Sequence, residues 1–451
     1  MRLHPGQAPR SDTSYRKVQK RMITFRSAVR SCVPLVLYVG ICAAPNLAHA
    51  QGAQDYIVQF AEGATPAMRG AAVANAGAEV RFVYGQVRAA AVRVPNEQAL
   101  AALRNNPSVV SIIPNRAISA HPSAAGKASA TGGNGGAPAQ VIPAGVARVG
   151  IPSSGSNGLG VGVAILDTGV DLAHPDLSGI VDAFSAFGAS CTDDQGHGTH
   201  VAGTVGARDN SIGVIGVAPA AQLYCVKVLD RNGSGSDATL MAGLDWVLAN
   251  HSVVSPAIRV INMSLGRPGT IDDNPAMRDL VAALDLAGVS VVASAGNDSS
   301  VEISQQLPAA YPQVTAVTST TAISGSNQCR FLAAPIAADT ASYFTTDGSG
   351  VGAAAPGEEQ ENVSRGCAIQ SVGILSTLRG GGTTRMSGTS MASPHVAGVV
   401  ARYYQQNPSY SPADIRAWLA TDADRPGIAP LDSPTNGYTY DGVREGVVQA
   451  P

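Results

Sequence analysis

From residue 140 onward the sequence alternates between short apolar strands and helical stretches, and this alternation restricts the fold more than any other feature. Residues 161–166 read Val-Gly-Val-Ala-Ile-Leu, a continuous apolar run that is typical of a strand buried on both faces. The pattern predicts an α/β fold in which helices cover both faces of a parallel sheet. Ligands in such folds bind at the carboxyl ends of the strands. Further strands are predicted at 222–228, 260–263, 289–294 and 314–318, and helices at 197–206, 237–250, 274–288, 390–405 and 411–420.

Residues 51–121 predict a smaller α+β domain that precedes this large domain of residues 139–451. The order of its elements, strand-helix-strand-strand-helix-strand, is that of a ferredoxin-like fold. Residues 122–138 are rich in Ala, Gly and Ser, and we expect them to form a flexible linker. The predicted strands of the small domain are 56–60, 79–82, 89–94 and 109–113, and its helices are 65–77 and a second one capped by Asn96.

Residues 1–50 have the pattern of a secretory signal peptide. Basic residues up to Arg30 precede an apolar run at 33–44, and Ala48-His49-Ala50 supplies a cleavage site of the small-x-small type. The run is too short to span a bilayer comfortably, and a retained membrane anchor is the alternative interpretation. We therefore expect a secreted protein, extracellular or periplasmic, with no membrane association after the signal is removed. Met22 is an alternative start.

The charges of the chain are unevenly distributed. The net charge is −2, but residues 122–451 contain 16 Lys and Arg against 27 Asp and Glu, a net charge of −11. This acidic character argues against nucleic acid as a partner and is compatible with bound cations.

Four cysteines lie outside the signal sequence: Cys191, Cys225, Cys329 and Cys367. No pair has the C-x-x-C spacing of a zinc cage or a thioredoxin-type motif. In an oxidising compartment four cysteines can form two disulfides in three ways. The pairing of neighbours along the chain closes the shortest loops and is the one we favour, whereas a cytosolic protein would keep four free thiols.

Four polar residues lie where such a sheet places its ligands. Asp167 ends the first apolar strand, and Asn297 follows a later one. His197 and Ser390 open predicted helices, and Pro394 is expected in the first turn of the Ser390 helix, where its missing N–H has no intrahelical partner. Together they supply an acid, a base suited to proton transfer near neutral pH, an amide donor, and a hydroxyl beside helix N–H groups that could hold a negative oxygen.

Each of these residues, taken alone, also has an ordinary structural interpretation. Ser390 could cap its helix, and Asp167 or Asn297 could form a turn. His197 and His200 could bind a metal, although the general-base Glu that such zinc motifs carry between their ligands is missing.

The chain order Asp, His, Ser is that of subtilisin, and five motifs closely resemble those of the subtilisin-like serine endopeptidases. The resemblance covers residues 140 to about 420, and residues 51–121 resemble, more weakly, the inhibitory propeptide of the same enzymes. The five motifs are Asp-Thr-Gly at 167–169, Gly-His-Gly-Thr-His-Val-Ala-Gly at 196–203, Ser-Leu-Gly at 264–266, Ala-Gly-Asn at 295–297 and Gly-Thr-Ser-Met-Ala-Ser-Pro-His-Val-Ala-Gly at 388–398.

The resemblance implies a role for each catalytic residue. Ser390 would be the nucleophile, and His197 would accept its proton and later donate it to the leaving amine. Asp167 would orient His197 and stabilise its charge. Asn297 and the Ser390 backbone N–H would form the oxyanion hole.

The resemblance also implies a substrate groove with two edges that hold an extended peptide as an added strand. Asp298 would lie at the rim of the pocket for the residue before the cut and would tolerate a basic side chain. The two edges would be Gly233, Ser234 and Gly235 on one side and Ser264, Leu265 and Gly266 on the other; simple turns are the alternative interpretation.

A structural calcium site is implied as well, because oxygen ligands of the kind that Ca²⁺ prefers occur at the family's usual positions. A plain solvated loop is the alternative. Gln140, Asp176 and Asn210 would bind through side-chain oxygens, and Arg208, Ile212 and Val214 through backbone carbonyls.

These implications add up to a secreted serine endopeptidase made as a self-processing zymogen. Its substrates would be extended polypeptides, its own propeptide would inhibit it, and we expect a monomer with no organic cofactor. The sequence departs from the family in its long linker, which leaves the mature N-terminus between about 120 and 139, and in insertions at 323–341 and 358–371.

Two other classes of function are weighed against the peptidase. An inactive protein that captures extended peptides would keep the fold, but every catalytic position here is filled. An esterase or lipase would be expected to show a G-x-S-x-G elbow, and the sequence Gly-Thr-Ser-Met-Ala at 388–392 lacks the second Gly.

Overall fold

The computed structural model describes residues 52–120, 139–151, 155–332, 335–423, 433–437, 441–443 and 445–451. The signal sequence predicted at 1–50 and the linker predicted at 122–138 lie outside these ranges. Within them, none of the helices is both long enough and apolar enough to cross a membrane.

The first part of the described chain is an antiparallel sheet with two helices on it. Thr65 and Asn96 cap the two helices through their side-chain oxygens, as is usual for these residue types. The strand order is β2-β3-β1-β4, so the ferredoxin-like arrangement is confirmed. The elements are β1 (Gln54–Phe60), α1 (Pro66–Asn75), β2 (Glu79–Val83), β3 (Ala89–Val94), α2 (Glu97–Arg104) and β4 (Val109–Pro114).

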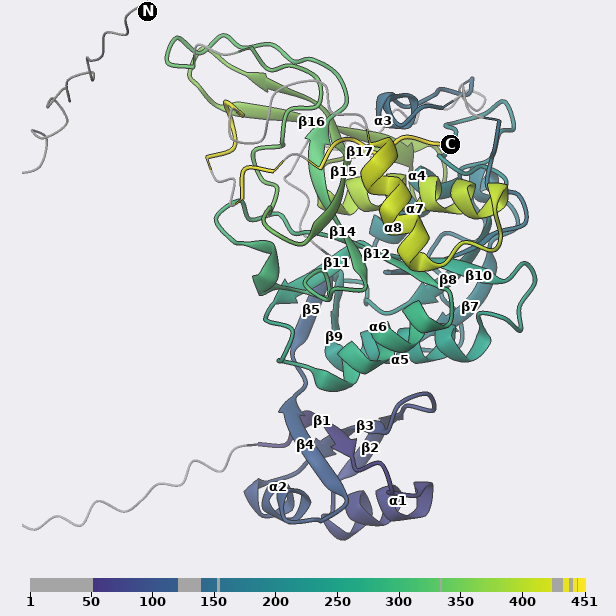
Figure 1. Cartoon of the computed structure of the whole chain (residues 1–451), viewed down its shortest axis with the longest axis vertical. Helices are drawn as coiled ribbons and strands as arrows, with labels where there is room; N and C mark the ends of the chain where they lie inside the picture. Colours follow the sequence, from purple (N-terminus) through teal and green to yellow (C-terminus); the bar gives the residue numbers. More distant parts are fainter. Residues whose placement is uncertain are drawn as a thin grey trace, which may run out of the picture. The chain divides into compact units, whose positions relative to one another are not determined.

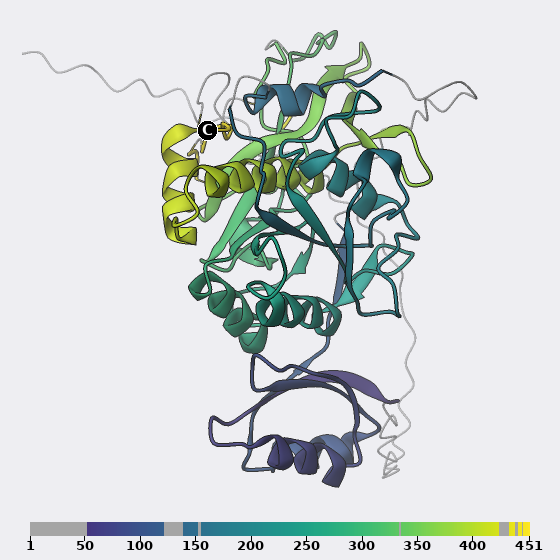
Figure 2. The ribbon, with the colours of Figure 1, turned by 90° about the vertical axis from the view of Figure 1, so that its right-hand side faces the viewer.

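A nine-stranded sheet forms the centre of the rest (Figures 1 and 2). Its order is β17-β16-β15-β14-β12-β10-β6-β8-β7, and the strands from β15 to β7 are all parallel. The strands are β6 (Gly162–Asp167), β7 (Val181–Ser185), β8 (Gln222–Lys227), β10 (Ile258–Met263), β12 (Ser290–Ser294), β14 (Val314–Thr321), β15 (Val351–Val363), β16 (Ile369–Thr377) and β17 (Thr383–Met386).

Helices cover both faces of this sheet, as the alternation predicts. Val163 and Ile165 of β6 belong to the core under α3, α4, α7 and α8, while Ala164 and Leu166 belong to the core under α5 and α6. The buried strand therefore separates two cores. The helices are α3 (Ala144–Arg148), α4 (His197–Gly206), α5 (Asp237–Asn250), α6 (Pro275–Leu286), α7 (Thr389–Gln406) and α8 (Pro412–Asp422), with short 3₁₀ turns at Pro175–Leu177 and Ile303–Gln305.

A second, small sheet has the order β13-β11-β5-β9. Its strands are β5 (Ala117–Ala120), β9 (Ser234–Ser236), β11 (Leu265–Pro268) and β13 (Gln306–Leu307). β5 follows the N-terminal sheet in the chain, so this small sheet joins that part to the large one.

The structure contains the two disulfides that close the shortest loops, Cys191–Cys225 and Cys329–Cys367. The residues at 358–371, which we expected to form an inserted loop, are mostly the antiparallel hairpin of β15 and β16. The polar composition of this segment hides the strand pattern. Cys329 and Val363 lie in a small buried cluster beside the hairpin.

The hairpin buries two carboxyl groups next to each other. Glu358 and Glu361 are both inaccessible to solvent. Burial, followed by the charge of Glu361 and a hydrogen bond with it, raises the pKa of Glu358 well above its ordinary value, although the hydroxyls of Ser342 and Ser371 partly oppose this. The pair is therefore stable with a proton on Glu358.

We predict that Glu358→Gln makes the protein more resistant to alkaline pH. A carboxyl group whose pKa is raised by folding contributes its full stability at acidic pH and loses it as the pH rises through the raised pKa. The neutral amide needs no proton. Thermal unfolding followed by circular dichroism should therefore show a melting temperature above wild type at pH 9, by about 2–4 °C for each kcal/mol of this linkage, and a smaller difference at pH 4. The exposed Asp272→Asn, in the large domain, is the control, and equal melting curves of the Glu358→Gln protein and wild type at pH 9 would contradict the prediction.

Candidate active site

Asp167 and His197 are brought together by the end of one strand and the start of one helix. β6 ends at Asp167, and α4 begins at His197. The Nδ1 atom of His197 lies 2.8 Å and 3.0 Å from the two carboxylate oxygens of Asp167, and both side chains are buried. Gly196 precedes the helix with φ +118°, a conformation that is easy only for glycine.

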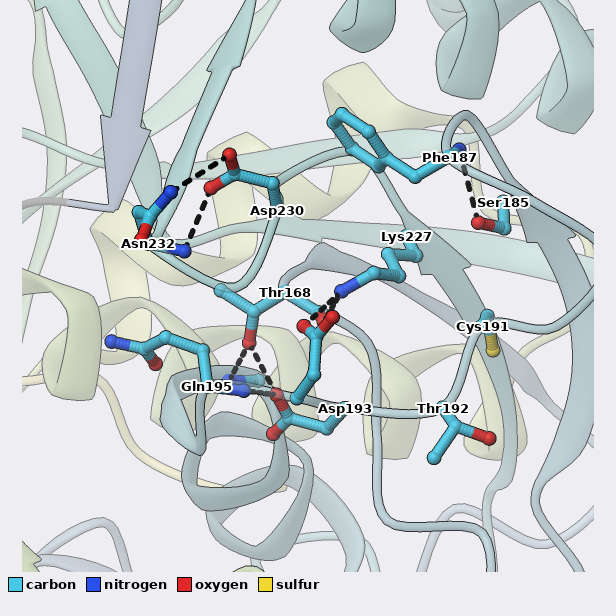
Figure 3. A network of polar contacts seen from close by, with 12 residues as sticks. Thr168, Ser185, Phe187, Cys191, Thr192, Asp193, Gln195, Lys227, Asp230 and Asn232 are labelled. Carbon is cyan, nitrogen blue, oxygen red and sulfur yellow. Dashed lines mark hydrogen bonds and ion pairs between the residues drawn. The ribbon is translucent and has the colours of Figure 1, made fainter.

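A second aspartate, which the sequence analysis missed, anchors this pair (Figure 3). The Oδ1 atom of Asp193 accepts the backbone N–H groups of Gln195 and Gly196, both at 2.9 Å, and its Oδ2 atom accepts that of Thr199 at 3.0 Å. Asp193 also accepts the Thr168 hydroxyl at 2.9 Å, and that hydroxyl in turn accepts the N–H of Gly198. Asp193 lies three residues before Gly196, the N-cap residue of α4, and therefore outside the position at which a capping Asp is recognised in a sequence.

Lys227 holds the turn that follows Asp167. It ends β8 beside Asp167 in the sheet and is almost fully buried. Its ammonium group donates to the backbone carbonyl of Thr168 and, at 2.6 Å, to the carboxylate of Asp194. The Thr168 carbonyl accepts from Lys227 and the Thr168 hydroxyl donates to Asp193 (Figure 3), so the backbone next to Asp167 is held at two points.

Ser390 lies in the first turn of α7, and Gly388 precedes the helix with φ +148°. Pro394 is the sixth residue of the helix, so its expected position in the first turn is wrong. Because Pro394 has no N–H, it cannot bond the carbonyl of Ser390, four residues earlier. The Ser264 hydroxyl donates to that carbonyl instead, at 2.8 Å.

The hydroxyl of Ser390 donates to the carbonyl of Ser264 at 3.1 Å. The Nε2 atom of His197 is buried and has no hydrogen-bond partner among the described residues, although α4 packs against α7. Rotation about χ1 moves a serine hydroxyl between staggered positions, and a buried nitrogen without a partner is costly. In this structure the Ser390 hydroxyl is bonded to Ser264, and the outer ring nitrogen of His197 is not bonded to it.

Asn297 is fixed beside the same helix start. Its side-chain oxygen accepts the backbone N–H and the hydroxyl of Thr389, both at 2.8 Å. The amide nitrogen therefore lies toward Gly388, where a Cβ atom would come within 2.9 Å of it. Only glycine fits at 388.

Burial and charge compete at His197. Burial is the largest single influence and by itself lowers the pKa, but the charge of Asp167, the hydrogen bond to it and the charge of Asp193 together outweigh burial and raise the pKa above 6.5. The site is thus suited to accept a proton at Nε2 and to keep it while a negative group forms nearby.

The expected groove edges face each other across β5. Leu265 and Gly266 pair with Ala120 and Ser119, and on the other side Gly235 pairs with Ile118. The Ala120 N–H donates to the carbonyl of Gly233 at 2.9 Å. Ser234 pairs with Ser119, so five of the six edge residues contact β5, and the sixth, Ser264, bonds Ser390.

Asp298 is exposed, one residue after Asn297. Its carboxylate accepts the backbone N–H and the hydroxyl of Ser300 at 2.9 Å and 2.5 Å.

The six residues of the expected calcium site converge around one loop. The Gln140 side chain lies 2.7 Å from the carbonyl of Arg208 and 3.4 Å from that of Val214. Asp176 accepts the Val214 N–H through Oδ2. Its Oδ1 atom is buried and accepts no well-formed hydrogen bond from a described residue, and the Asn210 side chain lies beside the carboxylate.

The side chain of Arg208 is bonded elsewhere. The Arg208 guanidinium points to the carbonyls of Ser178, Pro219 and Ala221. A Cβ atom at Gly213 would lie 2.4 Å from Asp176, so this glycine creates space at the carboxylate. Burial raises the pKa of Asp176. The buried carboxylate of Asp176, together with the neutral oxygen atoms of the other expected ligands, is a suitable ligand set for a calcium ion.

We predict that Asp193→Asn lowers the pKa of His197, because it removes a negative charge that stabilises the imidazolium. The pKa can be read from the pH dependence of the imidazole ¹H and ¹⁵N chemical shifts in NMR spectra. Asp194→Asn is the matched control, since its carboxylate pairs with Lys227. An unchanged titration of His197 in the Asp193→Asn protein would contradict the role given to Asp193.

Comparisons with known proteins agree with this geometry. Residues 158–444 match the Subtilase family, Peptidase_S8. Subtilisin E of Bacillus subtilis (strain 168) is 34% identical over 382 residues, which cover 82% of this chain and 85% of the relative. Subtilisin Savinase of Lederbergia lenta is 39% identical over 297 residues, which cover 65% of this chain and 95% of the relative.

Two solved structures share the fold. Fervidolysin from Fervidobacterium pennivorans, a keratinolytic enzyme, has a TM-score of 0.65 at 23% identity, covering 89% of this chain and 61% of that one. A cold adapted subtilisin-like serine proteinase has a TM-score of 0.51 at 30% identity, covering 65% of this chain and 95% of that one. The paired aspartate and histidine, the family match and the long alignments to subtilisins lead to one conclusion: the chain belongs to the subtilase family and is a serine endopeptidase.

Proposed function

We propose that Asp167, His197, Ser390 and Asn297 are the catalytic residues of a secreted peptidase that is made as a self-processing zymogen. The observation that carries this proposal is the buried hydrogen bond between Asp167 and His197, which leaves the opposite ring nitrogen without a partner. That nitrogen is suited to take the proton of the Ser390 hydroxyl.

In the proposed mechanism Ser390 turns from Ser264 toward His197 and attacks the carbonyl carbon of the substrate while His197 removes its proton. Asp167 stabilises the imidazolium that forms and fixes its orientation. The Asn297 amide and the Ser390 backbone N–H donate to the developing oxyanion. His197 then protonates the leaving amine, and water hydrolyses the acyl-enzyme by the reverse sequence.

We propose extended polypeptides as substrates. The support is β5, which lies between the two groove edges as an antiparallel strand. A substrate in its place would bind mainly through backbone hydrogen bonds, with little demand on side chains. Asp298 is exposed and negatively charged, which supports its proposed tolerance for a basic residue before the cut.

We further propose that residues 51–121 inhibit the enzyme until they are removed. Besides β5, three contacts support this proposal. The hydroxyl of Tyr84 donates to the carbonyl of Ala238 at 3.1 Å, and the backbone N–H groups of Gly85 and Gln86 donate to Asp245 at 2.9 Å and 2.7 Å. Self-cleavage within or next to residues 122–138 would free the groove and release a monomeric enzyme.

We propose a structural Ca²⁺ held by Gln140, Asp176 and Asn210 through side-chain oxygens and by the carbonyls of Arg208, Ile212 and Val214. A bound calcium ion would supply the positive charge that Asp176 lacks and cross-link the loop at 208–214 to residue 140. It would support stability rather than chemistry.

We predict that the purified Ser390→Ala chain stays uncut, because it has no nucleophile for self-cleavage. Mass spectrometry of the wild-type protein should find the mature N-terminus between about 120 and 139, and the variant should keep its full precursor mass. The exposed Ser409→Ala is the control and should be processed normally. Normal processing of pure Ser390→Ala would rule out self-cleavage.

We predict that Asp176→Asn reduces the stabilisation that Ca²⁺ gives, because the only carboxylate of the site is lost. Addition of CaCl₂ to EDTA-treated protein should raise the melting temperature of wild type more than that of the variant. Asp209→Asn, in the same loop but outside the proposed ligands, should respond like wild type. An equal response of all three proteins would contradict this calcium site.

A further inference from the structure

A small cavity lies where the C-terminal segment meets the edge of the parallel strands. Its volume is about 20 Å³, and Asp347, Glu445 and Val447 are among its lining residues. The segment is held on β15 by two backbone hydrogen bonds, from Ala354 N–H to the Gly446 carbonyl and from Val448 N–H to the Ala354 carbonyl, at 3.2 Å and 3.0 Å. A space of this size accommodates one water-sized group or ion.

Three carboxylates converge beside this cavity: Asp347 and Glu445 line it, and Asp441 lies close to both. One oxygen each of Asp347, Asp441 and Glu445 lies within 4.8 Å of the other two. Asp347 comes from the loop before β15, while Asp441 and Glu445 come from the C-terminal segment, so residues nearly a hundred positions apart in the sequence supply the cluster. Three negative charges at such distances repel one another unless a cation lies between them.

The side chain of Asp347 gives an independent indication of a ligand. It is only 4% exposed, and its Oδ2 atom has no hydrogen-bond partner among the residues that the structure describes. Burial raises the pKa of Asp347 to about 6, and the charge of Asp441 adds to this rise while a hydrogen bond from the Gly348 backbone opposes it. A buried carboxylate oxygen that lacks a donor is costly.

No basic side chain in the described part of the chain forms an ion pair with Asp347 or Asp441. Asp339 also lines the cavity, but its carboxylate is already bound by Arg148 at 2.6 Å and 3.0 Å. Asp347 and Asp441 are therefore the carboxylates whose negative charge is not balanced by a described basic side chain, whereas the charge of Asp339 is balanced.

We propose that Asp347, Asp441 and Glu445 bind a hard divalent cation of the calcium class. The cluster offers carboxylate oxygens without His or Cys, which favours Ca²⁺ over zinc or copper. The ion would tie the C-terminal segment to the strand edge at β15. This site shares no residue with the loop of Asp176, Asn210 and Gln140, so the two sites can be tested separately.

The test counts bound calcium in the full-length chain. Isothermal titration with CaCl₂ is carried out after EDTA treatment, in a Ser390→Ala background that prevents self-digestion. The double variant Asp441→Asn with Glu445→Gln should bind one calcium fewer per chain than its parent. The control, Glu62→Gln with Glu97→Gln, removes two exposed carboxylates and should bind as many as the parent.

Melting temperatures separate an ion site from a purely structural cluster. Without calcium, the double variant should melt no lower than the parent because it loses charge repulsion, whereas its gain on adding CaCl₂ should be smaller. Asp347→Asn should behave in the same way: it should melt no lower than the parent without calcium and should gain less from added CaCl₂. An unchanged calcium count, or a lower melting temperature in EDTA with an undiminished calcium gain, would overturn the proposal. The Asp176→Asn protein should lose a different calcium, so failure at one site is distinguishable from failure at the other.

Discussion

The buried hydrogen bond between Asp167 and His197 is the interaction on which the rest of the site depends. It joins the end of the central strand β6 to the first residue of α4, so the sheet and the helix must both be in place for it to form. Asp193 and Lys227 hold the surrounding backbone from opposite sides of Thr168. The charge of Asp167, its hydrogen bond to the ring and the charge of Asp193 together outweigh burial at the imidazole and raise its pKa. A proton acceptor is thus prepared in a place where burial alone would keep the ring neutral and poorly basic.

Ser390, the proposed nucleophile, is held by a second set of contacts, which starts from a missing hydrogen bond. Pro394 leaves the Ser390 carbonyl without its helical partner, and the hydroxyl of Ser264, which directly precedes β11, donates to this carbonyl instead. The backbone carbonyl of the same serine accepts the Ser390 hydroxyl, so a residue of the proposed groove edge also fixes the position of the proposed nucleophile. With β5 lying between the groove edges, Ser390 rests on Ser264. We interpret this as the resting arrangement of a chain whose own strand occupies the place of the substrate.

Sequence periodicity was sufficient for the features that depend on local pattern. The bounds of α4 and α5 agree with the predicted helices at 197–206 and 237–250, and the paired cysteines were favoured from loop length alone. Periodicity was not sufficient where contacts between distant parts of the chain determine the structure. The β15–β16 hairpin is rich in polar residues that are buried against one another, and Asp193 acts through hydrogen bonds to several chain segments. Asp347 and Glu445 form no motif because they meet only after the C-terminal segment has packed on the sheet.

Covalent labelling tests the central claim most directly: three side chains remote in sequence make one hydroxyl reactive. The processed protein is treated with an organophosphorus probe that reacts with activated serines, and the adduct is located by peptide mass spectrometry. The account predicts a single adduct on Ser390, with labelling lost in a His197→Ala variant processed in trans by wild-type enzyme. Labelling of a different serine, or equal labelling of Ser390 without the imidazole, would contradict it.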